Sequence, residues 1–142
     1  MTLKTITTTL LLSMASAAAS ADSRIASFDL GSLDTLDALG LSEQVVGVPK
    51  QNLPAYLAQY RADHYADIGG LRSPDMDAIR ASQPSLILYT GRQADWEAEL
   101  GDIAPLLNTG VTGDDYLAAF DANVRELASQ LAVENDAEAA LE

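Results

Sequence analysis

The residues best suited to bind a ligand follow an apolar run near the middle of the chain. Residues 86–89 (LILY) are continuously apolar, which is typical of a strand covered on both faces of a sheet. Thr90 and Gly91 end this predicted strand, and Arg92 follows. Ligands of open α/β sheets bind at the carboxyl ends of strands, where a guanidinium group can donate to an anionic ligand. Position alone leaves two interpretations open, and it favours an ordinary surface arginine over a ligand-binding one.

Other residues could serve catalysis or metal binding, but each has a simpler interpretation. His64, the only histidine, lies between Asp63 and Tyr65 and could act as a general base in a small enzyme. No nucleophile accompanies it, which favours an exposed loop residue. Asp34 and Asp37 lie one helical turn apart and fit the solvated face of a helix. The five tyrosines could include a phenolate ligand for ferric iron, although core or rim aromatics are commoner.

Several motifs that indicate enzymes are missing from the sequence. It contains no GxGxxG, Walker A, GxSxG or HExxH motif, and it has no cysteine. A nucleotide site, a serine-hydrolase elbow and a zinc-peptidase site therefore lack sequence support. The net charge of −13 argues against binding to nucleic acid or to an anionic membrane. We predict a protein that is not an enzyme, with no catalytic residue, no metal site and no resident cofactor.

The amino-terminal residues have the pattern of a targeting segment. Residues 1–21 combine Lys4, an apolar stretch and the small-x-small site Ala19-Ser20-Ala21, as in a cleaved secretory signal peptide. A membrane anchor is the rival interpretation, but the stretch is short and rich in Ala, Ser and Thr. The remaining chain has the length of one domain, and 48% hydrophobic residues indicate a folded one. An exported, acidic chain without cysteine suggests the periplasm.

Short apolar segments alternate with helical patterns along the chain. Four of these segments have the length of strands: residues 24–29, 45–48, 65–68 and 86–89. Residues 103–107 lead into a fifth, edge-like strand. A single helix separates the first two strands, which implies parallel pairing, and no Asn-Gly hairpin turn is present. The sequence predicts an α/β fold: a three-layer, Rossmann-like lobe with a mostly parallel sheet.

Helix boundaries can be predicted from capping residues and apolar spacing. Gly40 should end a first helix, and Ser73 should cap a later one, with Pro74 at its first position and Asp75 in its first turn. Thr112 and Asp115 resemble a capping box before the last long helix. That helix carries an apolar stripe, which we interpret as core packing. The stripe consists of Leu117, Phe120, Val124, Leu127 and Leu131.

Six segments together resemble one known family. In chain order they are FDLGSLDTLDALGL (28–41), VVGVPKQNLPAYL (45–57), YADIGGL (65–71), LILYTGRQ (86–93), IAPLLN (103–108) and DDYLAAFDANVREL (114–127). They resemble the amino-terminal lobe of periplasmic substrate-binding proteins of iron-siderophore ABC importers. The most similar group handles catecholate siderophores of the enterobactin or petrobactin type. Beyond the signal peptide of residues 1–21, the resemblance implies a lobe over 22–134 and the start of a truncated connecting helix over 135–142.

The resemblance also implies a ligand, a partner and site residues. A ferric siderophore would lie in a cleft between two lobes, with Arg92 contacting its anionic catecholate oxygens and with Asn52 and Lys50 on the rim. A monomeric periplasmic carrier would deliver this ligand to an inner-membrane ABC permease. Asp77, with Asp75 nearby, would pair with permease arginines, although an ordinary exposed acid is an equal interpretation. The alternative function is a lone-lobe or remnant protein that contacts the permease without binding iron.

Overall fold

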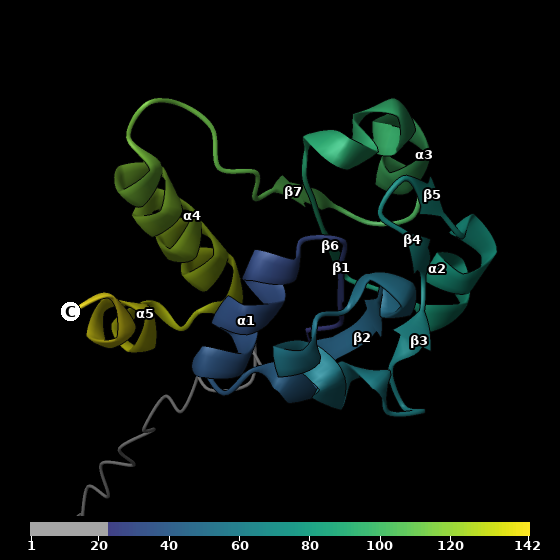
Figure 1. The fold of residues 1–142 in the computed structure, drawn as a ribbon, viewed down its shortest axis with the longest axis horizontal. Helices are drawn as coiled ribbons and strands as arrows, with labels where there is room; N and C mark the ends of the chain where they lie inside the picture. Colours follow the sequence, from purple (N-terminus) through teal and green to yellow (C-terminus); the bar gives the residue numbers. More distant parts are fainter. Residues whose placement is uncertain (1–22) are drawn as a thin grey trace, which may run out of the picture.

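A five-stranded parallel sheet forms the centre of the computed structural model, which describes residues 23–142. The strands are β1 (Ile25–Ser27), β2 (Val45–Val48), β3 (Ala66–Asp67), β6 (Leu86–Tyr89) and β7 (Leu106–Asn108). Their order is β3-β2-β1-β6-β7, and every neighbouring pair is parallel. The predicted parallel α/β sheet is thus confirmed (Figure 1). The predicted signal peptide lies outside the described residues.

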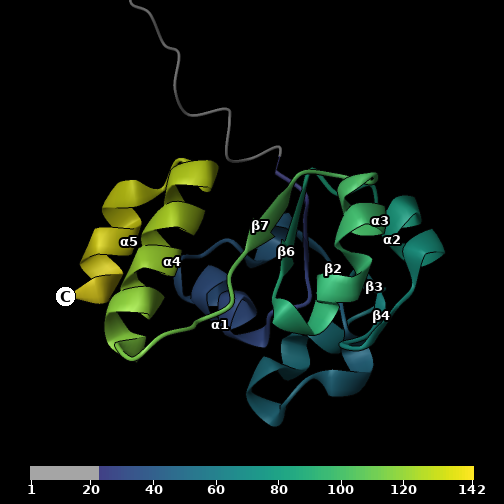
Figure 2. The ribbon, with the colours of Figure 1, turned by 90° about the horizontal axis from the view of Figure 1, so that it is seen from above.

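Helices cover both faces of this sheet. Figure 2 shows α1 (Leu30–Ala38) and α4 (Tyr116–Leu131) on one side of the strands, and α2 (Met76–Ser82) and α3 (Glu97–Gly101) on the other. Successive strand residues point to opposite faces, so a strand inside the sheet can contribute to two cores. Leu86 and Leu88 join the core with α1, whereas Ile87 joins the core with α2 and α3. The predicted three layers are therefore present.

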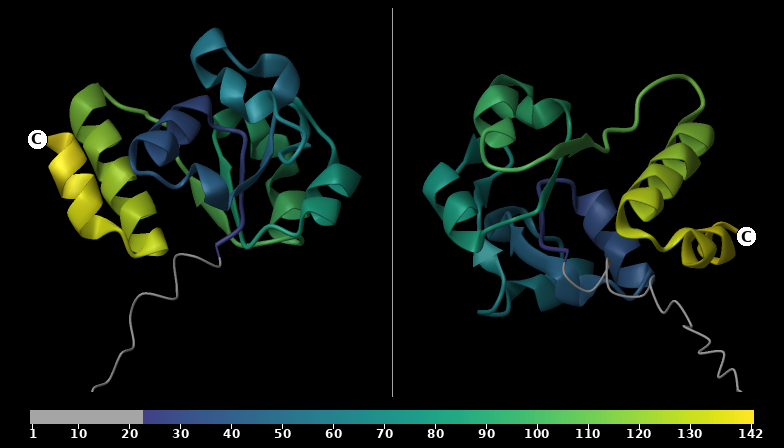
Figure 3. Two further views of the ribbon diagram at one scale, coloured as in Figure 1. Left: turned by 90° about the horizontal axis from the view of Figure 1, so that it is seen from below. Right: turned by 180° about the vertical axis from the view of Figure 1, so that it is seen from behind.

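The carboxyl-terminal helices form a pair beside the sheet. A long loop leads from β7 to α4, and α5 (Glu134–Leu141) packs back against α4 through Val124, Ala128 and Ala137 (Figure 3). The apolar stripe of α4 is buried at Val124, Leu127 and Leu131, as core packing requires. Leu117, however, is 72% exposed, so the prediction of core packing was wrong at the first position.

Two predicted helix starts were wrong. Asp75 caps α2 by accepting from the Ala78 N–H at 3.0 Å, and Asp115 caps α4 by accepting from the Ala118 N–H at 3.0 Å. Ser73 cannot cap α2, because Ser73–Pro74 forms β5 and pairs antiparallel with β4 (Gly69–Gly70). The β4–β5 hairpin turns through Leu71 and Arg72, so it has no Asn-Gly signal and the sequence did not predict it.

Short 3-10 helices fill most of the remaining connections. They are η1 (Ser42–Gln44), η2 (Lys50–Asn52), η3 (Ala55–Arg61) and η4 (Gly91–Trp96). η2 and η4 directly follow the carboxyl ends of β2 and β6, so these turns carry the predicted site residues to one edge of the sheet. Across residues 23–142, every helix is too short or too polar to cross a membrane.

Candidate ligand-binding site

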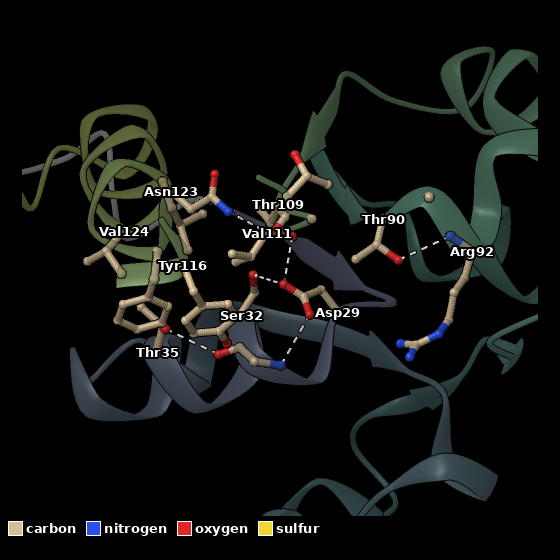
Figure 4. Close-up of a pocket in the computed structure, with 16 residues that line it drawn as sticks. Asp29, Ser32, Thr35, Thr90, Arg92, Thr109, Val111, Tyr116, Asn123 and Val124 are labelled. Atoms are coloured by element: carbon tan, nitrogen blue, oxygen red, sulfur yellow. Dashed lines mark hydrogen bonds between the residues drawn. The ribbon is translucent and has the colours of Figure 1, made fainter. Parts of the chain in front are cut away.

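A cavity of about 510 Å³ lies at the carboxyl ends of β1, β6 and β7. The loops after these strands supply Asp29, Thr90 and Thr109 to its wall. α4 contributes Tyr116 and Asn123 on one side, and η4 carries Arg92 on the other (Figure 4). Parallel strands bring their carboxyl ends to the same edge of a sheet, which is why residues from distant segments meet here.

Asp29 organises the floor of this cavity. Its carboxylate accepts hydrogen bonds from the Gly31 N–H at 3.2 Å, the Ser32 hydroxyl at 2.6 Å and the Thr109 hydroxyl at 2.7 Å. The bond to Gly31 also caps α1, whose amino terminus favours a negative charge. The Asn123 side chain donates to the Thr109 carbonyl at 2.8 Å, which connects α4 to the same network. Three donors thus hold the Asp29 carboxylate in place and fix the floor.

Arg92 combines a fixed backbone with an available side chain. Its N–H donates to the Thr90 hydroxyl at 3.3 Å, and the Gln93 side chain accepts from the Thr90 N–H at 2.9 Å. These two bonds form a capping box at the start of η4. Within residues 23–142, the Arg92 guanidinium group has no recorded hydrogen bond or ion pair, and the residue is exposed. All of its side-chain donors are therefore available to a ligand.

Lys50 and Asn52 lie at the end of β2 and do not line the cavity. The Lys50 ammonium donates to the carbonyls of Arg61 and Ala62 at 3.2 and 3.0 Å. The Asn52 side-chain oxygen accepts from the Leu71 N–H at 3.3 Å, and its amide donors have no recorded partner in the described chain. The structure thus brings Arg92, but neither of these residues, to the cavity, and their contact with a ligand stays a prediction.

Asp75 caps the start of α2 and Asp77 lies in its first turn, and neither lines the cavity. The Asp75 carboxylate is engaged in capping the helix. The Asp77 side chain is fully exposed and lies 3.6 Å from Arg80, one turn along the helix. An exposed pair of this kind contributes little to stability, so Asp77 can exchange Arg80 for another cation at small cost. Its predicted role in docking stays a prediction.

The remaining candidate residues are dispersed. His64 is exposed and packs against Tyr65, with ring centroids 4.0 Å apart and the ring planes tilted by 41°. Burial raises the pKa of the Tyr60, Tyr65 and Tyr89 phenols, which further disfavours the charged phenolate form. Among residues 23–142, no group of three His, Asp or Glu side chains is arranged to hold a metal ion.

Sequence reasoning overlooked Asp29, Thr109 and Asn123. The available signal was positional, because Asp29 follows β1 and Thr109 follows β7 just as Arg92 follows β6. Applying the strand-end rule to every strand would have found the first two residues. Asn123 lies within a helix and carries no such signal.

An α/β lobe with a cavity at the carboxyl edge of a parallel sheet defines a class of ligand-binding modules. The chain belongs to the periplasmic binding protein family, whose sequence profile matches residues 25–142. The predicted family resemblance is thereby confirmed.

Three relatives illustrate the similarity. The petrobactin-binding protein YclQ of Bacillus subtilis is 41% identical over 104 residues, which are 73% of this chain and 33% of YclQ. The crystal structure of YclQ superposes with a TM-score of 0.80 at 38% identity, covering 83% of this chain and 41% of that one. The ferric-anguibactin-binding protein FatB of Vibrio anguillarum is 31% identical over 86 residues, 60% of this chain and 26% of FatB.

The third relative is the periplasmic catecholate-siderophore binding protein VctP of Vibrio cholerae. Its crystal structure gives a TM-score of 0.72 at 30% identity and covers 83% of this chain and 42% of that one. The chain spans about a third of the length of YclQ and about a quarter of FatB. The similarity therefore concerns one part of the relatives, and the architecture of that part is shared.

Proposed function

We propose that this chain forms the ligand-contacting lobe of a protein that binds a ferric siderophore and delivers it to an ABC importer. The observation that carries the proposal is the free Arg92 guanidinium at the cavity of a chain from this family. The chemical class of the ligand is a ferric catecholate, in line with the similarity to the petrobactin-binding protein YclQ and the catecholate-siderophore binding protein VctP. The ligand is cargo, so the protein needs neither a resident cofactor nor a catalytic residue.

Electrostatics supports an arginine in this role. A ferric tris-catecholate complex is anionic, and a protein of net charge −13 repels anions at long range. Repulsion from distant exposed charges is screened beyond a Debye length of about 10 Å at 0.1 M salt, whereas a contacting guanidinium group acts at hydrogen-bonding distance. A local cation can therefore bind the ligand despite the overall charge. Asn52 and Lys50 are secondary candidates on the neighbouring loop.

The decisive experiment measures ligand binding in the full natural protein. Trp96, the only tryptophan, ends η4 and provides a fluorescence signal close to Arg92. We expect ferric enterobactin, a tris-catecholate complex, to quench this fluorescence. Arg92→Gln should weaken binding by about 10- to 100-fold, the equivalent of one charged hydrogen-bonding contact. Arg80→Gln is the matched control, because Arg80 is exposed and pairs with Asp77 on α2. Unchanged affinity of Arg92→Gln would contradict the proposal.

The proposed delivery requires a second surface and an extracytoplasmic location. We place the docking acid at Asp77, with Asp75 beside it, and the monomeric protein in the periplasm after cleavage of residues 1–21. Asp77→Ala should abolish binding to the permease in vesicles while leaving siderophore binding unchanged. Asp34→Ala, an exposed acid on α1, is the control. Permease binding that survives Asp77→Ala would remove this assignment. Permease binding without siderophore binding would support the alternative function, a lone-lobe interaction protein.

A further inference from the structure

α4 lines the cavity with an apolar face that ends in an aromatic side chain. The face consists of Tyr116, Phe120, Val124 and Leu127, which follow one another at intervals of four, four and three residues. Residues at these intervals lie on the same side of a helix. Val124 and Leu127 are buried, whereas Tyr116 is 63% exposed. This apolar wall therefore runs from the core to the surface, and Tyr116 forms its outer end.

Leu117, with which the predicted apolar stripe begins, does not belong to this wall. It is exposed, and it does not line the cavity. Neighbouring residues of an α-helix point about 100° apart around its axis, so a helix that turns Tyr116 to the cavity turns Leu117 away from it. Both residues lie one turn before Phe120, and spacing alone could not choose between them. The aromatic residue, and not the leucine, takes the cavity position.

Hydrogen bonds hold this end of α4 in place. The Asn123 side chain donates to the Thr109 carbonyl at 2.8 Å, and the Thr109 hydroxyl donates to the Asp29 carboxylate at 2.7 Å. The Asp115 side chain caps the helix by accepting from the Ala118 N–H at 3.0 Å. The turn that carries Tyr116 is thus tied to the floor of the cavity and to its own helix. A wall that is fixed in this way loses less conformational entropy on binding than a mobile segment would.

The opposite side of the cavity is polar. Figure 4 shows Tyr116 on α4 and Arg92 on η4, across the cavity from one another. Arg92 is the only cationic residue that lines the cavity in the described chain. The hydroxyl groups of Tyr60 and Tyr65 donate to carbonyls, whereas the Tyr116 side chain has no recorded hydrogen bond or aromatic neighbour within residues 23–142. An aromatic ring and a guanidinium group are therefore both available, on opposite sides of one cavity.

We propose that Tyr116 and Phe120 form a subsite for one catechol ring of the ligand, with the iron-binding oxygens of the ligand turned towards Arg92. This inference rests on the proposed siderophore-binding function. A catechol ring is apolar on its face and carries its oxygens on its edge, so the ring can pack against Tyr116 while the oxygens point to the polar side. An iron-binding group without an aromatic ring offers Tyr116 no such contact. Tyr116 is therefore a residue that determines which class of siderophore this lobe prefers.

The test compares variants of Tyr116 in the full natural protein, with ferric enterobactin as the probe and Trp96 fluorescence as the signal. Tyr116→Phe keeps the ring and should bind within about twofold of the wild type. Tyr116→Leu keeps an apolar side chain without the ring and should weaken binding by about 3- to 10-fold. Tyr116→Ala should weaken it by about 5- to 30-fold, because apolar contact area is lost as well. Tyr56→Ala is the matched control, since Tyr56 is 64% exposed and does not line the cavity.

The outcomes separate the two proposals. If Arg92→Gln weakens binding while Tyr116→Leu and Tyr116→Ala match Tyr56→Ala, the catechol subsite is overturned and the siderophore-binding function stands. If Tyr116→Phe loses as much affinity as Tyr116→Leu, the hydroxyl group and not the ring makes the contact, which also overturns the subsite. If the wild type does not bind ferric enterobactin, both proposals are overturned. Tyr116 is exposed at the first position of α4, where alanine and leucine are good helix formers, so the unfolding midpoints of these variants should equal that of the wild type.

Discussion

Gln93 connects the candidate site to the rest of the lobe through a single buried amide. Its side-chain oxygen accepts from the Thr90 N–H, and its side-chain nitrogen donates to the Leu71 carbonyl. The residue is fully buried, so water cannot replace either partner. A buried polar group that loses its partner costs more than a typical hydrogen bond contributes. Gln93 therefore stabilises the turn that carries Arg92 and the hairpin that carries Arg72.

Removing this amide should destabilise the protein. We expect Gln93→Ala to lower the free energy of unfolding by about 1–3 kcal/mol, because it leaves the Thr90 N–H and the Leu71 carbonyl without their partners. Urea denaturation followed by circular dichroism measures the change. Gln130→Ala is the control, since Gln130 is exposed on α4 and should give a change within about 0.5 kcal/mol. Equal effects of the two substitutions would show that the Gln93 bonds contribute nothing.

Tyr60 should make the free energy of unfolding fall as the pH becomes alkaline. Burial, followed by the negative charge of Asp37, raises the pKa of its phenol above the ordinary value of about 10. Above that pH the unfolded chain loses the proton while the folded chain keeps it, so the stabilisation is intact below pH 10 and is lost as pH rises. Tyr60→Phe should therefore flatten the decline of unfolding free energy above pH 10. Tyr56→Phe, at a 64% exposed position, should leave the decline unchanged. A parallel decline in both variants would contradict this account.

At the residue scale, the sequence predicted where a site residue lies in the fold better than it predicted which groups that residue contacts. The position of Arg92 could be predicted because the continuous apolar run of residues 86–89 shows where the strand ends. The engagement of Lys50 with two carbonyls could not be predicted, since those carbonyls belong to a turn eleven and twelve residues away. The role of Asp29 depends on Thr109, which β7 brings to it across the sheet. Contacts of this kind follow from the folded topology and not from local residue types.

At the element scale, apolar runs predicted the ends of strands more accurately than capping residues predicted the starts of helices. β2 and β6 occupy the predicted residues 45–48 and 86–89, because buried strands need continuous apolar side chains. Capping residues were ambiguous, since Ser73 and Asp75, like Thr112 and Asp115, all have side chains that can cap. For α2, Asp75 and not Ser73 is the cap, because the backbone of Ser73 pairs with Gly70 in the hairpin. Short hairpins of this kind have little sequence signal.

The end of α4 offers a way to stabilise the protein. Ala132 follows this helix with φ +56°, a left-handed conformation that disfavours residues with a Cβ atom. We expect Ala132→Gly to raise the free energy of unfolding by about 0.5–1 kcal/mol, because glycine adopts this conformation without steric cost. Ala122→Gly, at an exposed position inside α4, should instead lower it by about 1 kcal/mol. Thermal unfolding measures both, and a loss of stability in Ala132→Gly would contradict the strain at this residue.

At the scale of the whole molecule, amide protection against hydrogen exchange should be highest in the strands that the two cores share. β1 and β6 lie inside the sheet with helices on both faces, and their buried residues contribute to both cores. Amide hydrogens in such positions exchange only when the whole fold opens. We expect the Phe28 N–H, bonded to the Leu88 carbonyl, and the Ile87 N–H, bonded to the Pro105 carbonyl, to exchange most slowly. Hydrogen exchange followed by NMR tests this, with the exposed Ala139 of α5 as the fast reference.

The position of β1 has a consequence for the order in which the molecule is assembled. β1 is made first but lies between β2 and β6, and the Arg24 N–H donates to a Ser85 hydroxyl 61 residues further along the chain. In a growing polypeptide β1 therefore lacks one of its two neighbours until β6 has been synthesised, and the sheet is complete only after β7 has followed. The cavity forms later still, because Thr109 and Asn123 must be added before its floor is closed. During synthesis the first strand can thus pair with β2 on one edge, while its other edge has no partner until β6 has been made.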